Sequence, residues 1–123
     1  MGTATSPVWQ FLVQARSAPR DTSWGSVFDP NGDGEMVALV GANGANAGAG
    51  AGHIYYGSAT GLGTTGTALT STLGTGAGAA AASAGDFNGD GFADGLLGSP
   101  TGTSGWVGIY RGGASGLATA WNA

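Results

Sequence analysis

Cysteine and lysine are both absent from this chain of 123 residues, and arginine occurs only at Arg16, Arg20 and Arg111. The lack of cysteine excludes disulfides and thiolate metal sites. Nucleic-acid binding is not expected, because the neutralisation of phosphates requires clustered cations that three separated arginines do not supply. No apolar run approaches the ~20 residues that a membrane-spanning helix needs, so we expect no membrane insertion.

Large aliphatic side chains and charges are also scarce. Leu, Ile, Val and Phe together account for 20 of the 123 residues, and charged residues make up 8%. Such a chain would be disordered at high net charge, but the net charge is only −4. The 27 glycines and the short Tyr, Trp, Ile and Val clusters instead predict an all-β fold with small residues in its strands. A core this thin needs support from a metal or from a partner subunit.

The segment 86–94, with the sequence Asp-Phe-Asn-Gly-Asp-Gly-Phe-Ala-Asp, is the most informative part of the chain. Ca²⁺ binds about six to eight oxygen atoms, and oxygen-bearing side chains at alternate positions of a tight loop supply most of them. Gly89 and Gly91 permit the φ values that such a loop requires. The predicted Ca²⁺ ligands are Asp86, Asn88, Asp90, the backbone carbonyl of Phe92, and Asp94.

The same pattern occurs 57 residues earlier in the chain, where the predicted ligands are Asp29, Asn31 and Asp33. Val37 stands at the ninth position of this first loop, so we expect the first loop to bind Ca²⁺ weakly, if at all. A second pair of similar segments begins at Tyr55 and at Tyr110, 55 residues apart. A fixed period indicates a repeat architecture in which one unit cannot bury its own apolar face. We therefore expect a first repeat over residues 1–66, with an N-terminal outer strand, and a second over 67–123.

Apolar runs bounded by glycine predict strands on both sides of each loop. In the first repeat the expected strands are 8–13, 24–28, 36–40 and 53–56, with a flexible turn over 43–52. In the second repeat they are 67–73, 77–84, 92–97 and 106–110. The run Ala79–Ala82 favours a helix on propensity alone. The repeat alignment and the glycines around this run favour a strand instead.

The second repeat resembles the FG-GAP repeats of integrin α-subunit β-propellers, and the first repeat matches them loosely. The residues that carry the resemblance are 82–94, Gly98-Ser99-Pro100 and Val107-Gly108-Ile109-Tyr110. The resemblance implies two four-stranded antiparallel β-propeller blades, each with a Ca²⁺ loop between its first two strands. The chain departs from the family pattern at Ala77, which replaces the Phe of the motif, and at Asn43, which replaces the Pro of a turn.

The same resemblance implies a Ca²⁺-stabilised module for binding or adhesion, located outside the cell or at the cell surface. Its ligand would be a glycan or a protein, and the Psathyrella-type lectins, which bind sugars between blades, are similar soluble proteins. The first residues of the chain carry no secretory signal, so an exported protein would be represented here in its mature form.

Two blades cannot close a propeller ring, because the fold calls for about four to eight. The apolar run Val8–Val13 is a complete strand with no blade before it, and the second repeat stops at Ala123 before a full outer strand. We expect the N-terminal strand to complete the second blade of a neighbouring chain. A closed homo-oligomer would then be a trimer or a tetramer, and contacts that do not close would give a filament.

The acidic loops also suit hairpin turns that Asx side chains stabilise through hydrogen bonds to the backbone. EF-hand and dockerin loops are set aside, because both need an acidic residue at position 12, where Leu97 and Val40 stand. We do not expect an enzyme, since His53 is the only histidine, Glu35 is the only glutamate and no nucleophile elbow is visible.

The aromatic residues, which include four tryptophans, allow two interpretations. They supply the core that Ala and Gly cannot, or one or two of them line a sugar site. Asn46, His53 and Arg111 would provide polar contacts at such a site. The alternative to a binding module is a purely structural, self-assembling protein without a ligand.

Overall fold

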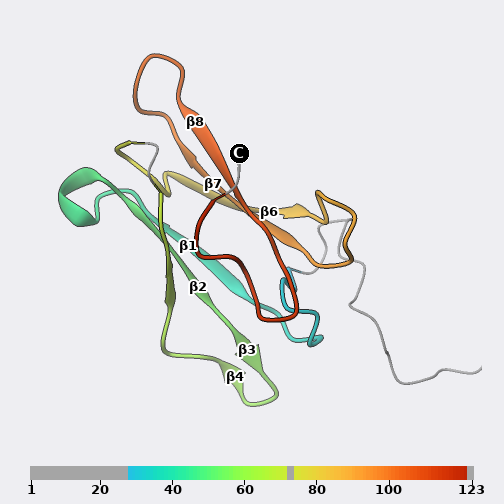
Figure 1. Ribbon diagram of the computed structural model, residues 1–123. Coiled ribbons are helices and arrows are strands. Elements are labelled where there is room, and N and C mark those ends of the chain that lie inside the picture. The colour runs from blue at the N-terminus through green and yellow to red at the C-terminus, as the bar shows by residue number, and fades with distance from the viewer. Residues whose placement is uncertain (1–27, 72–73, 122–123) are drawn as a thin grey trace, which may run out of the picture.

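The computed structural model describes residues 28–71 and 74–121, and this part of the chain is an all-β structure of three small antiparallel sheets (Figure 1). The first sheet has the order β1-β2-β5 and consists of β1 (Ala38–Ala42), β2 (Ala51–Tyr55) and β5 (Thr67–Leu69). The second sheet has the order β6-β7-β8 and consists of β6 (Ala80–Gly85), β7 (Asp94–Ser99) and β8 (Trp106–Tyr110). The third is a hairpin of β3 (Gly57–Ser58) and β4 (Gly61–Leu62).

The all-β prediction is confirmed, and the strand predicted over 106–110 coincides with β8. The alanine-rich run forms strand β6, as the glycines around it indicated. Gly78 and Gly85 have positive φ values of 84° and 65°, which an α-helix does not allow. A β-bulge follows Ser83 in the pairing of β6 with β7, and it turns the chain into the second acidic loop.

Three features differ from the sequence-based expectation. The strand that starts at Thr67 pairs with β2 of the first sheet, although the sequence grouped it with the second repeat. The hairpin β3–β4 was not expected. The segment 43–52 is not simply a flexible turn, because it contains the 3-10 turn η1 (Asn46–Gly48) and the beginning of β2.

Each of the two larger sheets has three strands within the described residues, where the family resemblance implied four. The strand expected over 8–13 lies outside the described residues. The strand expected over 24–28 also lies outside them, except for Phe28, which is not in a strand. The part of the chain that the structure describes contains no helix long and apolar enough to cross a membrane.

The two larger sheets pack against each other, with β6 lying next to β1 (Figure 1). Their contact is close because glycine faces large side chains: a Cβ added at Gly52 would overlap the side chain of Leu97. The buried core between them consists of Val37, Ile54, Leu69, Leu97, Tyr110 and Leu117. Burial of such side chains contributes about 1.5–3 kcal/mol each, so this small cluster is the main source of tertiary stability.

Polar contacts tie the segment after β8 back to the first sheet. The Tyr110 hydroxyl donates to the Thr70 carbonyl oxygen (2.9 Å), and the Leu117 amide donates to the Tyr56 hydroxyl (2.7 Å). The Thr70 amide donates to the carbonyl oxygen of Thr119 (2.8 Å). Burial raises the pKa of the Tyr110 hydroxyl above its ordinary value of 10.0, since the anion would lose its hydration. Both repeats therefore belong to one packed unit.

Candidate functional site

The second acidic loop connects β6 to β7 and is held by its own side chains. The Asp86 carboxylate accepts hydrogen bonds from the backbone amides of Asp90 (2.9 Å) and Gly91 (2.7 Å). Asp90 in turn accepts from the Phe92 amide (3.0 Å) and from Asn88 Nδ2 (2.8 Å). The oxygen-bearing side chains predicted at positions 1, 3 and 5 are thus brought together in one turn. Their hydrogen bonds are those of an Asx-stabilised turn, the second interpretation that the sequence left open.

Asp94 has a different position from the other predicted ligands. Its side chain is completely buried, with 0% of its surface exposed. One carboxylate oxygen accepts from the Phe87 amide (2.8 Å) and the other accepts from the Gly112 amide (2.8 Å). Asp94 therefore closes the loop and also fastens it to the segment after β8. This second role was not predicted, because Gly112 lies 18 residues further along the chain.

The first acidic loop, like the second, is held by hydrogen bonds from its own side chains. The Asp29 carboxylate accepts from the amides of Gly32 (2.8 Å) and Gly34 (2.9 Å), and it is completely buried. Asp33 accepts from the Glu35 amide and from Asn31 Nδ2. The glycines at positions 4 and 6 have left-handed φ values of 72° and 89° in the first loop, against 75° and 90° in the second. Two stretches with the same sequence pattern have adopted the same backbone turn.

The two loops differ at position 9. Val37 replaces the aspartate, its side chain belongs to the hydrophobic core, and its amide donates to the carbonyl oxygen of Phe28 (3.1 Å). An apolar side chain cannot bind a cation, so the first loop has one oxygen donor fewer than the second. This difference is the physical basis for expecting weaker binding there.

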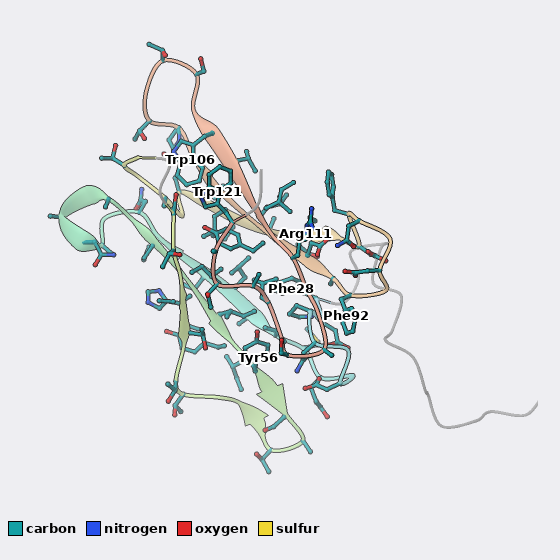
Figure 2. The ribbon with its side chains drawn as sticks, in the orientation of Figure 1. Phe28, Tyr56, Phe92, Trp106, Arg111 and Trp121 are labelled. Carbon is teal, nitrogen blue, oxygen red and sulfur yellow. The ribbon has the colours of Figure 1, made fainter. Side chains whose placement is uncertain are left out.

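The loops lie next to each other. The Ala93 amide at the end of the second loop donates to the Asp29 carbonyl oxygen (3.4 Å), and the Gly113 amide donates to the Pro30 carbonyl oxygen (2.9 Å). A Cβ at Gly112 would overlap the carbonyl oxygens of both Ala93 and Pro30, so the chains approach as closely as glycine allows. Figure 2 shows Phe92 and Arg111 on this same side of the molecule.

The donor chemistry of the loops fits Ca²⁺, which prefers carboxylate, amide and carbonyl oxygens. Each carboxylate oxygen has two acceptor directions, so one backbone amide leaves room for a second partner. The Asn31 Oδ1 atom is buried without a hydrogen-bond partner, and an oxygen in that state favours a donor or a cation. Within residues 28–71 and 74–121, however, no three Asp, Glu or His side chains converge as a group able to hold a metal.

A separate cavity of about 330 Å³ contains two of the residues that the sequence suggested for sugar contacts. Asn46 and His53 both line it, together with Thr70 and Ser71, whereas Arg111 does not. Asn46 and Ala47 have left-handed φ values of 53° and 56°, which are strained for residues with a Cβ. The sequence predicted a turn over 43–52 but not the left-handed conformation of these two residues, because neither is a glycine.

The chain matches no model of a known protein family, no curated protein and no solved structure.

Proposed function

We propose that this chain is a calcium-stabilised binding or adhesion module of the FG-GAP β-propeller type, acting outside the cell or at its surface. The observation that supports the proposal best is the pair of adjacent acidic loops with the same turn. Each presents an Asp-x-Asn-x-Asp set of oxygens, and one of these oxygens, Asn31 Oδ1, is buried without a donor.

The protein residues of the second loop would act as follows. Phe92 supplies its backbone carbonyl, and side-chain oxygens come from Asp86, Asn88, Asp90 and Asp94. Asp94 also holds the end of the loop against the Gly112 amide. Bound Ca²⁺ would neutralise the carboxylates that this loop gathers. The loop then joins β6 to β7 more firmly, which supports a fold with a small core.

Thermal unfolding tests the calcium proposal. At a Ca²⁺ concentration of about 100 Kd, binding stabilises the folded state by about 2.7 kcal/mol, which raises the Tm of a domain of this size by about 10 °C or more. Asp86→Asn keeps a neutral acceptor in the turn but removes a charged ligand, so it should lose most of this rise. Glu35→Gln removes the same charge outside the predicted ligand side chains and should keep it.

The measurement is a pair of melting curves for each variant, one in EDTA and one with Ca²⁺. Mg²⁺ serves as the selectivity control, since it requires a smaller, near-octahedral set of ligands and should give a smaller shift. Coincident curves for the parent chain in EDTA and Ca²⁺ would contradict the proposal.

A glycan is the ligand class we propose, because Asn46 and His53 line one cavity. Asn46→Gly removes the amide side chain and suits the φ of 53°, so it should reduce binding on a glycan array without unfolding the chain. Ala47→Gly makes the same kind of backbone change with no loss of a polar group and should bind like the parent. Equal binding by the two variants would exclude this cavity as the sugar site.

A second candidate function is a purely structural, self-assembling protein. It is favoured by the exposed apolar side chains Val40 and Val107, which are 46% and 61% exposed on the two larger sheets. Ordered rings or filaments in electron micrographs, combined with no reproducible hit on a glycan array, would favour this function over the binding module.

A further inference from the structure

The contact between the two larger sheets uses one particular face of each. On the first sheet, Leu39 and Gly41 of β1 lie opposite Ile54 and Gly52 of β2, and we call these four residues the forward face. On the second sheet, Gly95 and Leu97 of β7 lie opposite Tyr110 and Gly108 of β8, and we call these four residues the rear face.

The forward face of the first sheet and the rear face of the second fit together closely. Leu97 occupies the hollow over Gly52, and a Cβ at Gly95 would lie 3.4 Å from Leu39 Cδ2. The hydrogen bond from the Tyr110 hydroxyl to the Thr70 carbonyl oxygen crosses the same interface. The internal interface is therefore a forward face packed on a rear face.

The sequence repeat predicts that each sheet carries both kinds of face. Strand β7 repeats β1 at a spacing of 57 residues, and β8 repeats β2 at a spacing of 55. The paired residues Leu39 and Ile54 thus correspond to Leu96 and Ile109, which are also direct partners in the sheet. The forward face of the second sheet consists of Leu96, Gly98, Val107 and Ile109. The rear face of the first consists of Ala38, Val40, His53 and Tyr55.

Burial separates the used faces from the unused ones. Ile54 is completely buried on the forward face of the first sheet, whereas its counterpart Ile109 is only half-buried. Leu97 is completely buried on the rear face of the second sheet, whereas its counterpart Val40 is 46% exposed. Within residues 28–71 and 74–121, one forward face and one rear face thus remain open, and they belong to different sheets.

The open faces also have complementary shapes. A hollow of about 440 Å³ lies over the forward face of the second sheet, and its lining includes Gly98 and Val107. On the first sheet the equivalent hollow over Gly52 contains the Leu97 side chain, and the Gly78 backbone covers Gly41. The counterpart of Leu97 is Val40, an exposed apolar side chain that is one carbon smaller. The floor of the open hollow carries Val107 in place of Gly52, so an inserted Val40 side chain would meet an apolar side chain there.

We propose that the open forward face of the second sheet binds the open rear face of the first sheet of another copy of this chain. Val40 of one copy packs against Val107 of the next, as Leu97 packs on Gly52 within one chain. Neither face carries a charged residue, so no like-charge repulsion opposes the contact. Because the two faces differ, the interface is heterologous, and repeated contacts give a ring or a filament. This inference does not depend on calcium binding.

A complementation experiment tests the proposal. Val40→Glu blocks only the rear face, and Val107→Glu blocks only the forward face. Both positions are exposed, so each variant should fold, which circular dichroism checks. Sedimentation should show association of the 123-residue parent chain that increases with concentration, and each variant alone should stay monomeric. A 1:1 mixture of the two variants should form a dimer, since each retains the face that the other has lost.

Phe87→Glu is the matched control, because Phe87 is 69% exposed in the second acidic loop and belongs to neither face. This variant should associate like the parent. A parent chain that stays monomeric at every concentration would overturn the proposal. A mixture of the two face variants that stays monomeric would overturn it as well, and so would self-association of either variant alone.

Discussion

Replacement of Asp94 by alanine should destabilise the protein by about 3–5 kcal/mol even when no calcium is present. The Asp94 carboxylate is completely buried and accepts one hydrogen bond from Phe87 and one from Gly112. A hydrogen bond to a charged group contributes about 1.5–3 kcal/mol, and the alanine variant leaves both amides without their acceptor. A loss of this size is a large fraction of the stability of a small domain.

Urea unfolding in EDTA measures this effect without interference from metal binding. Asp90→Ala is the matched control, since it makes the same chemical change at an exposed position in the same loop and should cost less than about 1.5 kcal/mol. Equal midpoints for the two variants would mean that the Asp94 contacts to Phe87 and Gly112 do not stabilise the fold.

The second large effect is expected at the interface between the two sheets. Ile54→Ala should cost about 2–5 kcal/mol, because Ile54 is completely buried and its truncation leaves a cavity. Ile109→Ala is the same substitution at the repeat-equivalent position, where the side chain is only half-buried. At dilute protein concentration it should cost about 1 kcal/mol.

Thermal unfolding of both isoleucine variants at low concentration gives the comparison. If Ile109→Ala is as damaging as Ile54→Ala, then the forward face of the second sheet is covered within a single chain, and the internal interface is not the only one. At high concentration the cost of Ile109→Ala should increase, because the proposed association buries this residue.

Most strands could be predicted from the sequence, because their signals are local. The apolar segment Trp106–Tyr110 between glycines gave β8 with its observed bounds. Strand β6 could be predicted against its helix propensity, because Gly78 and Gly85 carry the φ values that only glycine adopts readily. The partner of the strand at Thr67 could not be predicted, since pairing with β2 depends on tertiary contacts that leave no mark in a three-residue strand.

The positions of the acidic loops in the chain could also be predicted, from the alternation of Asp, Asn and Gly. The sequence also offered a turn whose Asx side chains accept hydrogen bonds from their own backbone, but it did not reveal the contact between Asp94 and Gly112. Asp29 and Asp86 bind the amides of their own loops, which is a local property of Asx residues. Asp94 contacts Gly112, and this contact appears only once β8 has folded back beside β7.

Isothermal titration calorimetry of the 123-residue chain with CaCl₂ measures directly whether the acidic loops bind calcium. We predict saturable binding with a Kd of about 0.1–1 mM, the range of extracellular calcium modules. This binding should be lost in Asp86→Asn and retained in Glu35→Gln. Heats that match the dilution of CaCl₂ into buffer, for the parent chain at millimolar concentrations, would contradict the assignment of the acidic loops as calcium sites.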